Sequence, residues 1–293
     1  MRLADAVASF QLQLEADGRS RHTCEQYARH IRLLESWLSK EGLRDDLDEI
    51  DHQTIARFLC SSDARMSQRG GSKRPTSINA LRSSLRSFFS YCELADWCRQ
   101  SPARLIRRAR CGSPPSRALS EVDQQRLLTT LASARGRAAE RDYALFATIL
   151  GSGVRLSAAL AMRVEDVDLE NAEIVARCCK GGRVEKVLLS PAVCSHLLGF
   201  IGGRVSGLLF EGRNRCQLSR RHAGRRLERW MKVAGCRSPA NPHALRHAYA
   251  SRLYRQTGDL LLVQRALGHR SIVSTMVYAA ADPKRLRAAL QAY

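Results

Sequence analysis

The chain has 293 residues, which exceeds the usual size of a single domain and suits two hydrophobic cores. Its 48 Lys and Arg residues against 28 Asp and Glu residues give a formal net charge of +20, so nucleic acid is the expected partner. No apolar run is long enough to span a bilayer and the first residues do not resemble a signal peptide, so we expect a cytoplasmic protein without a membrane partner.

Apolar residues recur at helical spacing in four stretches of the first hundred residues. The first stretch closes at Asp17-Gly18, and the second begins at a cap on Ser20 or Thr23. The third covers residues 50–66 and the fourth follows a basic turn at 69–75. Residues 1–100 are therefore expected to form a small bundle of four helices.

Residues 101–116 lose this periodicity. They are basic and then rich in Pro, Gly and Ser, which is typical of a linker between domains. Being basic, such a linker could lie along a DNA backbone.

Residues 117–293 mix two periods. Ser120 resembles a helix cap, and helices are expected at about 137–150 and 154–164. Residues 172–177 and 184–189 are short and rich in β-branched residues, and the Gly-Gly turn between them predicts a β-hairpin. Helical spacing returns after Pro191. The second domain is therefore expected to be mainly α with one small sheet.

The ten cysteines could in principle indicate metal binding or disulfides. None forms a Cys-x-x-Cys pair, and no pair of histidines follows at the spacing of a zinc finger. We interpret them as reduced cysteines that pack as small apolar residues, and we expect no metal.

Six residues of the second domain could form a site for phosphoryl chemistry. Arg155 follows a Gly-rich turn, and His243 and Arg246 stand three apart, so they share a helix face. The candidate catalytic residues are Arg155, Lys180, His243, Arg246, His269 and Tyr278.

The residue types suit transfer of a phosphodiester to a tyrosine. An Arg offers a planar fork that phosphate oxygens accept at two points, and such fixed donors stabilise the charge that develops there. A phenol is a poor nucleophile at neutral pH, because its ordinary pKa is near 10, so neighbours must help it lose its proton. Taken singly, each residue also has an ordinary explanation: a surface Arg, a solvated Lys, a cap His or a core Tyr.

All six positions occur in the order and at the separations typical of the tyrosine recombinase (phage integrase) family, and the chain resembles its compact Xer-like subgroup. The resemblance covers the whole chain, because residues 19–37 resemble the start of the family's helical core-binding domain. It implies a two-domain DNA clamp, with a SAM-like core-binding domain at 1–100, a linker at 101–116 and a catalytic domain at 117–293.

The resemblance also implies the reaction. Tyr278 would attack DNA to give a 3′-phosphotyrosine and a free 5′-hydroxyl, Lys180 would protonate the departing oxygen, and His269 would bond a non-bridging oxygen. The enzyme would act as a homotetramer on paired double-stranded sites, at the nucleoid, with no cofactor. A short helix at 283–293, capped by Asp282, would dock on the neighbouring protomer.

Two departures from the family pattern are visible. Ala158 occupies a position where an acid is common, and Cys178-Cys179 precedes Lys180 where Gly is usual. Two alternatives remain open at this point: a type IB topoisomerase, and a regulator that binds DNA on a weakened recombinase scaffold. The sequence does not distinguish integration of a mobile element, transposon resolution and chromosome dimer resolution, and it does not identify the target site or accessory proteins.

Overall fold

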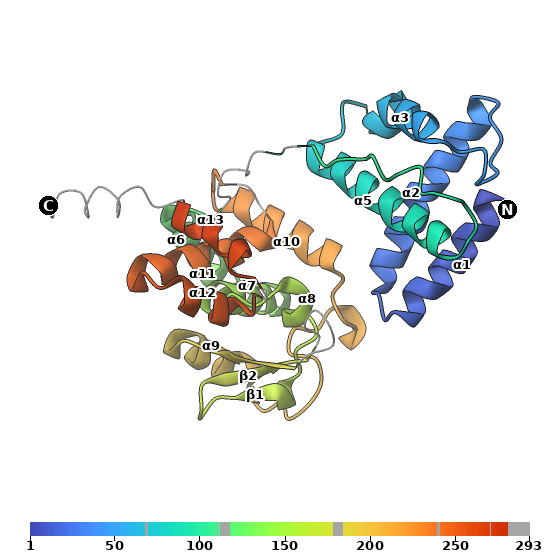
Figure 1. Ribbon diagram of the computed structural model, residues 1–293. Coiled ribbons are helices and arrows are strands. Elements are labelled where there is room, and N and C mark those ends of the chain that lie inside the picture. The colour runs from blue at the N-terminus through green and yellow to red at the C-terminus, as the bar shows by residue number, and fades with distance from the viewer. Residues whose placement is uncertain are drawn as a thin grey trace, which may run out of the picture. The chain divides into compact units, whose positions relative to one another are not determined.

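The computed structural model describes residues 1–67, 70–109, 111, 118–177, 184–238, 241–269 and 271–280 (Figure 1). The chain divides into two compact units, Met1–Gly112 and Ser113–Tyr293, and each unit has a hydrophobic core of its own. The division falls within the linker expected at 101–116. Residues 110 and 112–116 of this linker lie outside the described ranges. No helix of the described ranges is both long and apolar enough to cross a membrane.

The first unit is helical, as its periodicity predicts. Its helices are α1 (Leu3–Ala16), α2 (Arg21–Lys40), α3 (His52–Cys60), α4 (Ser62–Arg65) and α5 (Pro75–Leu94). Ser20 caps α2 by accepting the Thr23 backbone N–H. Phe10 contacts the rings of Tyr27 and Phe88 edge-on, which joins α1, α2 and α5 into one core.

The expectation of one helix over residues 50–66 is wrong, because Ser61 separates α3 from α4. Its backbone is extended, at φ −67° and ψ 160°. The Ser61 hydroxyl donates to the Phe58 carbonyl and accepts the Ala64 N–H, so one side chain ends α3 and starts α4. The apolar period continues through this break, which is why the sequence pattern does not reveal it.

The second unit is mainly helical with one small sheet, in agreement with the predicted fold class. Its α-helices are α6 (Glu121–Ser133), α7 (Arg137–Ser152), α8 (Leu156–Ala159), α9 (Pro191–Ile201), α10 (Arg220–Val233), α11 (Pro242–Thr257), α12 (Leu260–Leu267) and α13 (Met276–Ala280). Its short 3₁₀ helices are η1 (Val164–Asp166), η2 (Arg213–Arg215) and η3 (Ile272–Ser274). Ser120 caps α6 by accepting the Asp123 N–H, as expected.

The helix expected over 154–164 is much shorter. Helix α8 ends at Ala159, and the chain then bonds to a distant segment: the Val164 N–H donates to the Gly207 carbonyl, and the Leu209 N–H donates to the Met162 carbonyl. These long-range bonds take up backbone groups that a continuing helix would use. Local propensity alone could not have shown this competition.

The sheet has three strands in the order β1 (Val167–Asp168), β2 (Glu173–Ala176) and β3 (Glu185–Leu188), with antiparallel neighbours. Strands β2 and β3 form the expected hairpin, with Ile174 opposite Val187. Strand β1 was not predicted, since two residues are too few to show a period. The sheet lies at one edge of the unit beside α9 (Figure 1), and Ile174, Ala176 and Leu197 share the core. Residues 178–183, for which the sequence predicts a turn and which include Lys180, lie outside the described residues.

A buried acid joins α7 to α10. The carboxylate of Asp142 is almost fully buried and forms ion pairs with Arg141 and Arg226, while the Trp230 indole donates to it over 2.7 Å. A buried carboxylate is tolerated only when its oxygens are paired in this way. The network fixes α10 against α7 in the second unit.

Candidate active site

The turn after α7 places Arg155. Gly153 has φ +67°, and a Cβ there would lie 2.3 Å from Tyr249 Cδ1, so both conformation and space require Gly. The chain reverses at this residue, and Arg155 becomes the N-cap of α8. Arg155 is partly buried, and its Nη2 donates to the Gly268 carbonyl over 3.3 Å.

Arg246 holds two of these turns together. It lies on α11, which begins after the cap Asn241, and only 3% of its surface is exposed. Its Nη1 donates to the Gly153 carbonyl over 2.6 Å and its Nη2 to the Leu267 carbonyl over 2.5 Å. A charged side chain is rarely so buried unless its donors are used. Arg246 therefore ties the end of α7 to the end of α12.

His269 follows the αL cap of α12. Gly268 has φ +58°, and the His269 backbone N–H donates to the Gln264 carbonyl. The imidazole Nδ1 lies 3.0 Å from the Thr275 hydroxyl, which fixes the ring toward the α12–η3 turn. Burial, together with the charges of Arg246 and Arg155, lowers the pKa of His269 to about 4, so the imidazole is neutral at pH 7.

His243 is the most accessible of the site histidines. It lies on the first turn of α11 and is exposed to solvent. The part of the ring that is buried is enough to lower the pKa of His243, and the positive charges of Arg246 and Arg155 lower it further. Both arginines therefore act on His243, although they come from separate helices.

Tyr278 lies on α13 with only 3% of its surface exposed. It packs in a small apolar cluster with Ala250, Val263 and Leu267. Burial raises the pKa of the phenol, and the charge of Arg246 opposes that rise. Tyr278 is therefore buried like a core aromatic residue, and it also lies close enough to Arg246 for that charge to act on its phenol.

The structure brings together five of the six predicted site residues, which come from α8, α11, the end of α12 and α13. Contacts between residues up to 113 positions apart hold them, as the bond from Arg155 to Gly268 shows. Lys180, the sixth, lies outside the described residues.

One neighbour of this site was not singled out from the sequence. His247 lies one turn after His243, and the two rings are in edge contact with centroids 4.5 Å apart. The same His247 ring also contacts the Tyr278 ring, with centroids 5.4 Å apart. The spacing of four from His243 was a usable signal, but only the packing of α13 shows what the ring contacts.

The position of the missing acid is confirmed as apolar. Ala158 is buried at 2% exposure within the core, and no carboxylate of the described residues forms an ion pair with Arg155. Glu165 bonds Arg163 and the Gly207 N–H, while Asp166 pairs with Arg177. Neither acid substitutes for the absent one.

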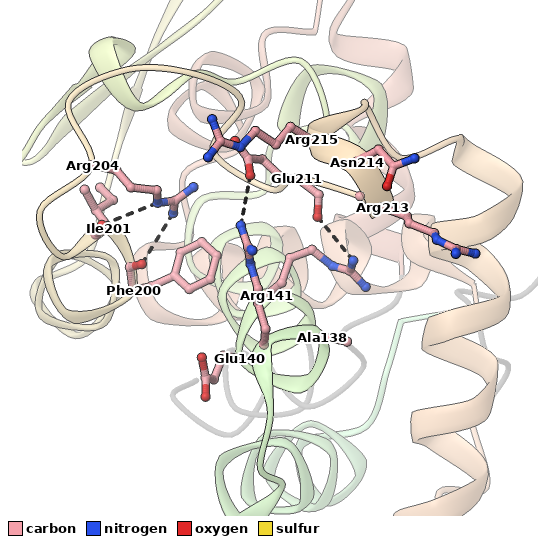
Figure 2. A pocket seen from close by; sticks show the side chains of 12 residues that line it. Ala138, Glu140, Arg141, Phe200, Ile201, Arg204, Glu211, Arg213, Asn214 and Arg215 are labelled. Atoms are coloured by element: carbon pink, nitrogen blue, oxygen red, sulfur yellow. Dashed lines mark hydrogen bonds and ion pairs between the residues drawn. The ribbon is translucent and has the colours of Figure 1, made fainter.

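A large pocket lies elsewhere in the unit, at the start of α7 and the end of α9 (Figure 2). Its volume is about 870 Å³ and arginines dominate its lining. The Arg137 side chain donates to the Glu211 carboxylate. Figure 2 shows Arg141 reaching the Glu211 carbonyl, and Arg204 bonding the carbonyls of Phe200 and Ile201. It contains none of the candidate catalytic residues. In the described ranges, no group of three or more His, Cys, Asp or Glu side chains could hold a metal.

The neutral histidines predict a loss of stability in mild acid. His247 and His269 have pKa values of about 4 in the folded protein, against about 6.5 when unfolded. Between these pKa values the unfolded chain binds more protons than the folded protein does. The free energy of unfolding should therefore fall as the pH drops below about 6.5, and the stabilising contribution of these two histidines should be fully present above that pH. Urea unfolding at pH 7.5 and 5.0 measures this, and His269→Gln should reduce the difference. A wild-type midpoint that does not change between these pH values would contradict the expectation.

Comparison with known proteins identifies the family to which the chain belongs. The model of the phage integrase family matches residues 117–285, and that of the phage integrase N-terminal SAM-like domain matches residues 7–95. The chain belongs to the phage integrase family. It is therefore a tyrosine recombinase, an enzyme of site-specific recombination that cleaves and rejoins DNA. The family and the fold class predicted from the sequence are both confirmed.

Relatives match over nearly the full length. Tyrosine recombinase XerC of Chromobacterium violaceum is 30% identical over 286 residues, covering 96% of this chain and 92% of the relative. Two solved structures share the fold at a TM-score of 0.74: XerH bound to difH DNA after cleavage, at 22% identity over 96% of this chain and 84% of that one, and the Tn1549 transposon integrase bound to circular intermediate DNA, at 20% identity over 98% and 99%.

Proposed function

We propose that Tyr278 is the nucleophile of this recombinase and that Arg155 and Arg246 bind the phosphate it attacks. The observation that carries the proposal is the convergence of these residues from separate elements. Arg246 bonds the turn that leads into Arg155 and the end of α12, and its charge acts on the phenol of Tyr278. Tyr278 would join the 3′-phosphate covalently while the 5′-oxygen departs.

The two arginines would stabilise the charge that the phosphate gains during attack. Their carbonyl partners hold both guanidinium groups in place before DNA arrives, and preorganised donors of this kind lower a barrier most effectively. A bound phosphate would also favour the protonated imidazoles of His243 and His269, because an opposite charge raises a histidine pKa. These rings could then donate to non-bridging oxygens.

Lys180 is proposed as the acid that protonates the departing 5′-oxygen. This role rests on family resemblance, because the residue lies outside the described ranges. Religation reverses the steps: a 5′-hydroxyl attacks the phosphotyrosine and the phenol leaves. The covalent bond conserves the energy of the broken phosphodiester, so exchange requires no ATP.

Mapping the covalent bond tests the assignment directly. A nicked duplex carrying the site that the protein selects from a randomised pool should trap the adduct, because the short cleaved strand diffuses away. Digestion with protease and nuclease, followed by mass spectrometry, should place the nucleotide on the peptide that contains Tyr278. A nucleotide attached to any other residue would refute the proposal.

Exposed arginines suggest where the catalytic unit meets the DNA backbone. Within the described part of the chain, the side chains of several exposed arginines of η2 and α10 form no ion pair or hydrogen bond: Arg213, Arg215, Arg220, Arg221, Arg225 and Arg229. Free guanidinium groups on one loop and helix suit phosphate contacts. Together with the basic first unit, these arginines would hold a recombination site from two sides, as a clamp. The protein would act at the nucleoid, in the cytoplasm.

Exposed apolar side chains on α12, η3 and α13 support assembly into a tetramer. Leu261 on α12 is 62% exposed, Val273 on η3 is 70% exposed and Met276 on α13 is 54% exposed. Large apolar groups clustered on a surface usually mark an interaction site. The predicted helix at 283–293 has one apolar face of matching character, and we propose that a neighbouring protomer's copy covers these side chains.

Deleting residues 282–293 should separate binding from assembly. The shortened chain should bind a single half-site with unchanged affinity, because the DNA-facing arginines remain, but it should lose cooperative binding to paired sites and fail to recombine. Gel-shift titration on one-site and two-site DNA measures both properties. A matched Leu286→Asp variant keeps the full chain and should show the same loss of cooperativity. Retained cooperativity in both variants would show that the segment packs on its own protomer.

A further inference from the structure

His247 connects the phosphate-binding face of α11 to the nucleophile. Helix α11 presents His243, Arg246 and His247 within two turns. The His247 ring meets the His243 ring edge-on at 4.5 Å and 81°, and meets the Tyr278 ring at 5.4 Å and 55°. It therefore contacts both a histidine proposed to face the phosphate and the tyrosine proposed to attack it.

The fully buried neighbours of Tyr278 in its cluster are the aliphatic side chains of Ala250, Val263 and Leu267, and the partly buried Tyr249 and Tyr254 pack against the same cluster. Among the described residues, the ring that pairs with the Tyr278 ring is that of His247. Aliphatic groups fill space around a phenol without preferring one ring orientation, whereas aromatic pairs favour particular tilted or edge geometries. The contact with His247 is thus suited to setting the angle at which the phenol points.

The imidazole of His247 is uncharged at neutral pH, and it lacks a hydrogen bond at one ring nitrogen. Its Nδ1 is buried without a hydrogen-bond partner. Burial lowers the pKa of His247 to about 4, with the charges of His243 and Arg246 adding to the effect. A buried nitrogen without a partner destabilises a fold, so hydrogen bonding by Nδ1 does not explain the presence of this side chain. The ring contacts remain as its clear structural contribution.

We infer that His247 is a positioning residue whose flat ring holds the phenol of Tyr278 in the direction of the phosphate bound by Arg155 and Arg246. The inference rests on the proposed role of Tyr278. It predicts an effect on the rate of attack and none on DNA affinity, because a small misplacement of a reacting group can cost about a hundredfold in rate.

Three variants test the inference on the nicked duplex described above, with single-turnover adduct formation measured at saturating protein. His247→Ala removes the ring and should slow adduct formation about a hundredfold while the dissociation constant stays unchanged. His247→Phe keeps a flat ring and removes the unpartnered nitrogen, so it should stay within about tenfold of wild type and unfold at a higher temperature.

His196→Ala is the matched control for loss of packing. His196 also has a buried ring nitrogen without a partner, and its ring contacts that of Tyr143 edge-on at 4.1 Å, on α9 and α7 rather than at the site. This variant should lose comparable stability and keep the wild-type rate. Wild-type cleavage by His247→Ala, or His247→Phe as slow as His247→Ala, would overturn the inference.

An external nucleophile distinguishes an effect on Tyr278 from one on the phosphate site. In a Tyr278→Phe background, hydrogen peroxide can attack phosphorus through one oxygen while the 5′-oxygen leaves and takes up a proton. Adding His247→Ala should leave this cleavage unchanged, whereas an equal loss would show that His247 acts through His243. If the wild-type adduct maps to another residue, the proposed function fails instead, so the two failures remain distinguishable.

Discussion

A Tyr278→Phe variant is expected to bind its DNA site with wild-type affinity and to form no covalent adduct. The substitution removes one oxygen from a side chain that is 97% buried by its own unit, so packing with Val263 and Leu267 is kept. No phosphate–oxygen bond to protein can then form. Denaturing gels of the nicked duplex detect the adduct, and gel shifts measure the affinity.

Tyr249→Phe supplies the matched control for the loss of a phenol oxygen. Tyr249 packs against the same cluster and its pKa is also raised by burial, but it is not among the proposed site residues. This variant should form the adduct at the wild-type rate. A protein–DNA band that persists in Tyr278→Phe would refute Tyr278 as the nucleophile, whatever the behaviour of the control.

Arg155→Ala is expected to lower the rate of cleavage by about 10²–10³-fold, which is the usual cost of losing one donor to a developing oxyanion. Arg155→Lys should recover little of this rate, because an ammonium group lacks the planar fork. Within the described ranges the Arg155 side chain makes one hydrogen bond, of 3.3 Å to the Gly268 carbonyl, so its removal should disturb the fold only slightly. Single-turnover cleavage together with thermal unfolding measures both effects.

Arg246→Ala should be equally inactive, because it removes a proposed phosphate donor and also disturbs the fold. Arg246 is buried and bonds the carbonyls of Gly153 and Leu267, which its loss would leave without these donors. Arg252→Ala is the control on the same helix, because Arg252 bonds the Leu150 carbonyl and is not among the proposed site residues. Near-wild-type cleavage by Arg155→Lys would show that charge alone suffices and that the two-point contact is unnecessary.

Local sequence determined much of the architecture. Ser120, and Ser20 as one of two candidates with Thr23, were recognisable as helix caps because a side-chain oxygen three residues before a backbone N–H is a local arrangement. The hairpin of β2 and β3 was predictable from its β-branched residues and the Gly-Gly turn. The six-residue pattern, from Arg155 to Tyr278, identified the family because its order and spacing are visible without coordinates.

Tertiary contacts decided the rest, because they join residues that the sequence separates. Helix α8 is short because the 207–209 segment takes up the backbone bonds of Met162 and Val164. Arg246 reads in the sequence as a phosphate ligand, and only the fold shows that it also fastens the ends of α7 and α12 together. Likewise, His247 becomes significant only where α13 brings Tyr278 against its ring. Residue order thus specifies which chemical groups are available, while packing between distant helices determines which groups touch and how deeply Tyr278 is buried.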